Sequence, residues 1–323
     1  MYIREEANIM DELLIDTRFI EKIVKNCETQ CFEHDENGII NDPYLAEYID
    51  VRVEEIKKMA PDNMTRLIAK KHVYEMNHLC TESEIILGSM FFELCGSIYN
   101  YIVKYFYKKD AYHDCVAHLM RHLIEIYHAF LSLMFSDFIS ACLSHLRILY
   151  ESYLILRYIM LHKNLSQNYI DHGVVARYRI TNGFKSHNTD EDLEVHYKLL
   201  IKKYGDDFCL PYGWTAPVIK NKSKRKLSTI AKELGLKDYN SLYILASEII
   251  HSSSFSVNYP IEDMKIFTPI NATAIELLSN GIIHFMKGMD VDQKNCLLLM
   301  NILYGLREDL YDEPKGLSQT TET

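Results

Sequence analysis

The chain is predicted to be all-α, a multi-helix bundle of about ten to eleven helices, because three observations agree. Apolar residues recur at the three- and four-residue spacing of amphipathic helices through most of the 323 residues. Only 12 glycines and 7 prolines are present, which is few turn-formers for this length. Helix-capping signals precede several of the periodic segments.

Each expected helix begins or ends at a recognisable residue. Pro61 ends the helix before it, since the residue ahead of a proline disfavours helical geometry. A capping box formed by Thr81 and Glu84 opens a long helix, and Asp110 and Asp137 are the expected N-caps of two central helices. The long helix is expected to end at about Lys108. The other expected helices span residues 4–32, 44–59, 62–78, 166–184, 190–204, 227–235, 239–252, 272–288 and 291–312.

Charge divides the chain into an acidic helical N-terminal region over residues 1–75, an all-helical core domain over 76–312 and a disordered tail over 313–323. Residues 1–60 hold 7 basic and 15 acidic side chains, which accounts for most of the net charge of −10. The acidic region is a candidate surface for a protein partner. Two irregular stretches are expected within the core domain, over residues 205–226 and 253–271.

The composition also narrows the class of protein. A net charge of −10 argues against a protein that coats nucleic acid over its whole surface. No segment reaches about 18 uninterrupted apolar residues, so no membrane span is expected. The eight cysteines are dispersed without a C-x-x-C pair, as is typical of free thiols, and we expect a cytoplasmic protein. Walker-type and dinucleotide-binding glycine motifs are absent, and no cofactor is expected.

Polar residues recur in a definite order between residues 121 and 252. The order is Arg121-x3-Glu125, Ala141-x5-Arg147-x3-Glu151, Tyr158, Trp214, Lys224-x-Lys226, and Tyr239-x3-Tyr243-x3-Ser247-x3-His251-Ser252. This pattern resembles the bacterial family catalogued as domain of unknown function five-six-seven-seven, over roughly residues 90–260. The resemblance implies an all-helical fold and singles out Arg147, Glu151 and His251. It carries no established chemistry.

Two polar stripes form the first candidate site. Tyr243, Ser247 and His251 recur every four residues and therefore share one stripe of one helix. Arg147 and Glu151 do the same on another helix. If the stripes face each other, Arg147 grips an anionic group, Glu151 orients it or His251, and His251 transfers a proton, supported by hydrogen bonds from Tyr243 and Ser247. The alternative is a buried polar network that only fixes helix register.

Arg121 and His128 form the second candidate site. Seven residues of helix place both side chains on one face. Their spacing is similar to the Arg-x4–6-His motif of HEPN-type helical ribonucleases, and that resemblance implies a HEPN-like core and a homodimer that joins two motifs on RNA. A histidine can move the 2′-hydroxyl proton and an arginine can stabilise the phosphorane charge. The same spacing also arises by chance, as between Arg157 and His162.

Two further patterns concern metal and phosphate. Glu-x-x-His occurs three times, at Glu75, Glu125 and Glu248, and paired copies hold di-iron centres in four-helix bundles. Glu55 and Glu93 would supply the lone carboxylates, but only twenty residues separate Glu55 from Glu75, with Pro61 between them. That is too little chain for two full-length bundle helices, so we expect no metal ligands. In the irregular stretch 205–226, Trp214 precedes a basic run that includes Lys224 and Arg225. These three residues are candidate substrate-binding groups, with the basic run beside Trp214 forming a lid that grips phosphate. The alternative is a solvated loop.

The sequence therefore leaves two main classes of function open. The first is a metal-independent RNA-cleaving effector of the HEPN-like type, a toxin or a component of antiviral defence, acting as a homodimer. The second is a non-catalytic helical module that binds a nucleotide, a nucleic acid or a protein partner through the same polar residues. A carboxylate and histidine metal-binding bundle is a third alternative.

Overall fold

Every regular element in the described part of the computed structural model is an α-helix or a short 3-10 helix, which confirms the predicted all-α fold. The described residues form ten α-helices and the helical segment 47–56, in agreement with the expected number. The chain divides into two compact units, which are described separately. The structure describes residues 17–28, 47–56, 58, 82–134, 139–183, 191–236, 240–250 and 267–312.

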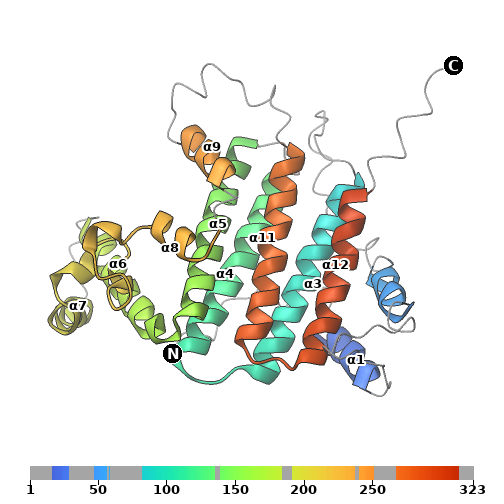
Figure 1. Ribbon diagram of the computed structural model, residues 1–323, viewed down its shortest axis with the longest axis horizontal. Coiled ribbons are helices and arrows are strands. Elements are labelled where there is room, and N and C mark those ends of the chain that lie inside the picture. The colour runs from blue at the N-terminus through green and yellow to red at the C-terminus, as the bar shows by residue number, and fades with distance from the viewer. Residues whose placement is uncertain are drawn as a thin grey trace. The chain divides into compact units, whose positions relative to one another are not determined.

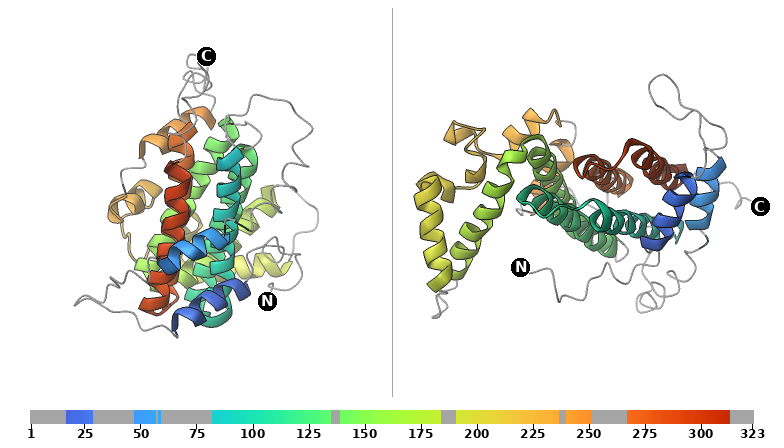
Figure 2. Two further views of the ribbon diagram at one scale, coloured as in Figure 1. Left: turned by 90° about the vertical axis from the view of Figure 1, so that its right-hand side faces the viewer. Right: turned by 90° about the horizontal axis from the view of Figure 1, so that it is seen from below.

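The first unit comprises residues 1–107, 120–150 and 241–323. Its central helix is α3, which packs against α1, α11 and α12 (Figures 1 and 2). The helices α4 and α5 each contribute several turns to both units, and α9 contributes its first residue, Asn240, to the second. The helices that build this unit are α1 (Thr17–Glu28), α3 (Glu82–Phe106), α4 (Ala111–Met134), α5 (Ile139–Leu161), α9 (Asn240–Ile250), α11 (Phe267–Gly288) and α12 (Gln293–Asp312).

Aromatic rings join the helices of the first unit. Phe91 of α3 meets Tyr127 of α4 edge to face, with ring centroids 5.9 Å apart, and both side chains are fully buried. Tyr99 of α3 stacks on Phe285 of α11 at 5.5 Å. Rings of this size remove large apolar areas from water, and burial of each contributes about 1.5–3 kcal/mol to stability. The apolar face of α3 is thus the centre of this core.

The second unit comprises residues 108–119 and 151–240. Its helices α6 and α7 pack side by side (Figure 1). The stretch 205–226, expected to be irregular, is a series of short 3-10 turns between α7 and α8. The elements are η2 (Lys163–Leu165), α6 (Ser166–Gly183), α7 (Glu191–Tyr204), η3 (Asp206–Cys209), η4 (Gly213–Thr215), η5 (Lys222–Lys224) and α8 (Leu227–Glu233).

Two helix starts show where local signals succeed and fail. The Asp110 carboxylate accepts a hydrogen bond from the backbone N–H of His113 at 2.9 Å, which confirms Asp110 as the N-cap of α4. The prediction that residues 253–271 form a loop is wrong at its end, because α11 begins at Phe267. Pro269 lies in the first turn of α11, where the N–H that proline lacks has no helical partner.

Two expectations concern the chain as a whole. Within the described ranges, no helix is both long and apolar enough to cross a membrane. The predicted domain boundary near residue 75 lies outside the described residues, so the division into 1–75 and 76–312 stays a prediction. The same holds for the tail over 313–323.

Candidate functional site

The stripe of polar residues on α9 includes a side chain that meets α5 within the first unit. The Cζ atom of Arg147 on α5 lies over the ring of Tyr243 on α9, 5.1 Å from its centroid. Tyr150, one turn further along α5, is inclined against the same ring at 5.6 Å. The Ser247 hydroxyl donates to the backbone carbonyl of Tyr243 at 2.9 Å. The structure therefore brings Arg147 together with Tyr243.

This cluster combines a cation with two phenols. Arg147 and Tyr243 are half-buried, whereas Tyr150 is buried. Burial raises the pKa of Tyr150, and the neighbouring Tyr243 raises it further, so the phenol stays protonated at neutral pH. A guanidinium over an aromatic face gains about 0.5–2 kcal/mol, depending on how far the pair is desolvated. Such a guanidinium donates hydrogen bonds from its edge, in a geometry that suits a phosphate.

The remaining members of the first candidate site are less defined. Glu151 lies one helical turn after Arg147 on α5 and is half-buried. His251 lies outside the described residues, as does Tyr239. The convergence of Arg147, Glu151 and His251 therefore stays a prediction.

Arg121 and His128 of the second candidate site share the face of α4 that is turned towards α3. Arg121 Nε donates to Glu125 Oε1 at 2.8 Å, and both side chains are partly exposed. The ring of His128 stacks on Phe92 of α3 at 4.5 Å. Burial raises the pKa of Tyr99 on α3 to about 12, against the nearby positive charge of Arg121. Here the arginine has a carboxylate partner and the histidine has an aromatic one.

The Glu-x-x-His pairs are the candidate metal ligands of the chain. Among the described residues, no three His, Cys, Asp or Glu side chains are grouped so as to hold a metal ion. One Glu-x-x-His pair is described in full, and its Glu125 accepts the hydrogen bond from Arg121. The pairs that begin at Glu75 and Glu248 lie wholly or partly outside the described residues.

Trp214 is part of the packing of the second unit. Its side chain is only 2% exposed, and it meets the rings of Tyr158 and Tyr169 edge to face at 6.1 and 5.0 Å. The Tyr158 hydroxyl donates to Glu233 Oε2 at 2.9 Å, which ties α8 to α5. The structure gives Trp214 a packing role, and its contact with a substrate stays a prediction.

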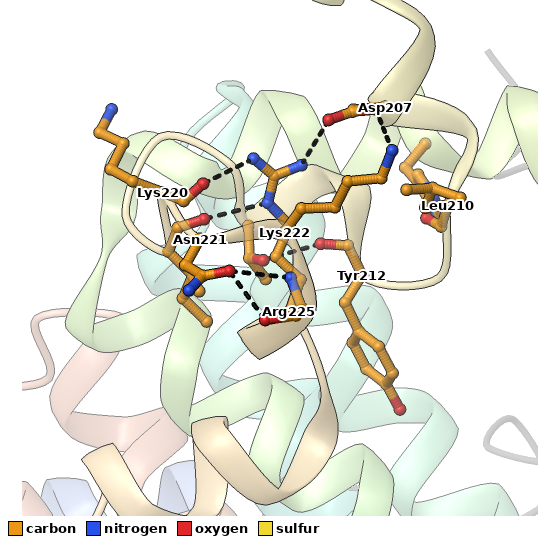
Figure 3. A network of polar contacts seen from close by, with 11 residues as sticks. Asp207, Leu210, Tyr212, Lys220, Asn221, Lys222 and Arg225 are labelled. Carbon is orange, nitrogen blue, oxygen red and sulfur yellow. Dashed lines mark hydrogen bonds and ion pairs between the residues drawn. The ribbon is translucent and has the colours of Figure 1, made fainter.

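The basic run contains an arginine whose side chain is held by hydrogen bonds (Figure 3). Arg225 Nε donates to the carbonyl of Ile219 at 3.0 Å, and Nη2 donates to the carbonyl of Lys220 at 3.3 Å. Lys222 Nζ donates to Asp207 Oδ1 at 2.7 Å, and this hydrogen bond holds the pKa of Asp207 below its ordinary value. Lys224, the other predicted binding residue, is exposed on η5.

Two residues of these clusters were not found from the sequence. Tyr150 follows Arg147 by three residues, and helical spacing would have placed both on one face. Asp207 has no comparable signal, because its partner Lys222 lies 15 residues away through an irregular segment.

His172 on α6 should make the stability of the second unit depend on pH. Burial lowers the pKa of His172, and the positive charge of Arg179 lowers it further. These effects outweigh the hydrogen bond that the ring Nε2–H donates to the carbonyl of Leu210, 3.1 Å away, which raises the pKa. The unfolded chain therefore takes up the proton more readily than the folded unit. The contribution of neutral His172 to the free energy of unfolding is fully present above the ordinary histidine pKa of about 6.5. It is lost as the pH falls below that value.

Urea denaturation at pH 7.5 and pH 5.5 measures this loss. We expect His172→Gln to reduce the difference between the two pH values, because glutamine can hydrogen-bond without titrating. His196→Gln is the matched control, since His196 is exposed on α7. An unchanged difference in His172→Gln would contradict the assignment.

Residues 113–264 match the model of a family described as Family of unknown function (DUF5677). This match confirms the resemblance seen in the sequence, and all the predicted site residues lie inside it. The comparisons lend no support to the HEPN-like resemblance. Neither a curated protein nor a solved structure matches the chain. The chemistry of the site therefore has to be argued from its side chains.

Proposed function

We propose that this protein binds RNA and cleaves it without a metal ion, as an effector of the toxin or defence type. The observation that supports the proposal is the position of the Arg147 guanidinium over the Tyr243 ring, with Tyr150 against the same ring. A cation beside aromatic rings suits a nucleotide, because the guanidinium can bind the phosphate and a ring can stack on a base.

The proposed reaction is attack of the RNA 2′-hydroxyl on the adjacent phosphorus. The 2′-oxygen forms a bond to phosphorus, the bond to the 5′-oxygen breaks, and the proton from the 2′-hydroxyl ends on the leaving 5′-oxygen. Arg147 would stabilise the extra negative charge of the phosphorane. His251, which follows Ser247 in the four-residue series, would carry the proton, and Glu151 would orient it. The products are a 2′,3′-cyclic phosphate and a 5′-hydroxyl.

Arg147→Ala should lower the rate of RNA cleavage by about 100-fold or more, the usual effect of removing a group that stabilises transition-state charge. The assay follows cyclic phosphate ends formed from a labelled single-stranded RNA in the presence of EDTA. Arg147→Lys keeps the charge without the planar edge and should restore only part of the rate.

Arg157→Ala is the matched control for this experiment. Arg157 lies on the same helix, with its Cζ atom 5.8 Å from the Tyr153 ring and its Nη1 atom donating to the Tyr153 hydroxyl at 2.9 Å. Its loss should leave cleavage unchanged. Equal loss in both variants, or cleavage that EDTA abolishes, would contradict the proposed role of Arg147.

The second candidate is a non-catalytic module that binds RNA or a nucleotide. It is favoured by the second candidate site, where Glu125 pairs with Arg121 and Phe92 stacks on His128. The same preparation separates the two functions, because binding of labelled RNA without strand scission identifies the module. The homodimer and the protein partner of the acidic N-terminal region are further parts of the proposal, and light scattering tests the first.

A further inference from the structure

We propose that Arg225 and Lys222 form a second binding site, one for a backbone phosphate of RNA, and that the Asp207 carboxylate occupies the phosphate position in the unbound protein. The choice of RNA as the ligand rests on the proposed function. The anion site itself rests on the geometry of the segment from Asp207 to Arg225 (Figure 3).

Arg225 is held in place with one nitrogen left over. The side chain is only 9% exposed, and its Nε and Nη2 atoms donate to the carbonyls of Ile219 and Lys220. The Nη1 atom is buried and has no hydrogen-bond partner. A buried donor without a partner is destabilising, and a charged donor more so. An anion with an oxygen within hydrogen-bond distance of Nη1 would relieve this.

Asp207 places a negative charge near Arg225 Nη1 but does not accept a hydrogen bond from it. Its Oδ2 atom lies 3.9 Å from Arg225 Nη1, which is an ion pair but too long for a hydrogen bond. Its Oδ1 atom is the one that binds Lys222. A phosphodiester also presents two oxygens that share one negative charge, set further apart around phosphorus. The Asp207 side chain is 48% exposed, so it can turn into solvent when a phosphate replaces it.

The surrounding charge favours a polyanion. The second unit holds 17 Lys and Arg against 12 Asp and Glu, whereas the first unit holds 18 against 33. Most of the basic excess follows η4, where Lys220, Lys224 and Lys226 are exposed on either side of Arg225. Several cations around one site can bind successive phosphates of one strand and release counterions. A single small anion would use Arg225 and Lys222 alone.

The test measures binding of a labelled 2′-O-methyl oligouridine by fluorescence anisotropy, because this ligand cannot be cleaved through its 2′-oxygen. Asp207→Asn should lower the Kd by about two- to fivefold, the range of one partly exposed charge interaction. Lys222→Gln should raise the Kd. Asp206→Asn is the matched control, since Asp206 is the exposed neighbour and its loss changes the net charge equally.

A structural brace predicts the opposite pattern. If Asp207 only anchors the loop, Asp207→Asn lowers resistance to urea and leaves the Kd unchanged or raised, and the proposal is overturned. It is also overturned if Asp206→Asn lowers the Kd equally. If the oligonucleotide does not bind but inorganic phosphate at millimolar concentration raises the urea midpoint, the site takes a small anion instead of RNA, and the proposal is overturned. None of these results depends on cleavage. A negative result in the cleavage assay of the Arg147 variants would therefore overturn the proposed function without deciding whether this anion site exists.

Discussion

Trp214→Ala is expected to lower the free energy of unfolding of the second unit by about 3–5 kcal/mol. The indole is 2% exposed and is enclosed by the edges of Tyr158 and Tyr169. Removing it leaves a large cavity, and the loss includes both the transfer of apolar surface and the contacts of the cavity wall. It would also loosen Tyr158, whose hydroxyl holds Glu233 of α8.

Urea denaturation followed by circular dichroism measures this loss. Leu199→Ala is the control, because Leu199 is 59% exposed on α7 and its truncation should change stability by less than about 0.5 kcal/mol. A loss below about 1 kcal/mol in Trp214→Ala would show that the indole is not part of the packing. The predicted role of Trp214 as a substrate contact would then regain support.

Gly213→Ala is expected to cost the second unit about 1–3 kcal/mol or more through steric overlap. A Cβ atom at Gly213 would overlap the carbonyl oxygen of Phe208 and lie 2.8 Å from that of Asp207. The Asp207 oxygen cannot move freely, because it already accepts a hydrogen bond from the backbone N–H of Leu210 at 3.3 Å. The preceding Tyr212 has a φ of 58°, in the left-handed region, so the turn is already tight.

Gly173→Ala provides a control of opposite sign. Gly173 lies within α6, and nothing lies within 4 Å of a Cβ atom placed there. Alanine is favoured over glycine in a helix by about 1 kcal/mol, so this variant should be slightly more stable. The urea midpoints of both variants, compared with that of the natural protein, measure these changes in stability. If Gly213→Ala is as stable as the natural protein, η3 and η4 are not in the close contact described here.

The helices were predictable because their signals are local. The fold of α3 and α4 follows from apolar spacing and from Asp110, whose carboxylate caps α4 as expected. The predicted loop ran to residue 271, whereas α11 begins at Phe267 with Pro269 in its first turn, a position that tolerates proline. The division of the chain into two units depends on contacts between distant segments, and periodicity carries no information about those.

The candidate site was predictable only in part, for the same reason. Four-residue spacing placed Arg147 on one stripe and Tyr243 on another, and the structure shows these two side chains in contact. Spacing says nothing about the conformation of an irregular segment, so the position of Asp207 beside Lys222 and Arg225 could not be foreseen. The packing of Trp214 against aromatic rings could not be predicted for the same reason, because Trp214 lies in that segment.

Trp214 is the only tryptophan of the chain, and it lies in the interior of the second unit. An indole enclosed by apolar groups emits light at a shorter wavelength than one in water. Excitation at a wavelength that tyrosine does not absorb would therefore record the unfolding of the second unit alone. The helical signal of circular dichroism records both units together. The natural protein thus carries its own probe for asking whether its two units unfold in one transition or in two.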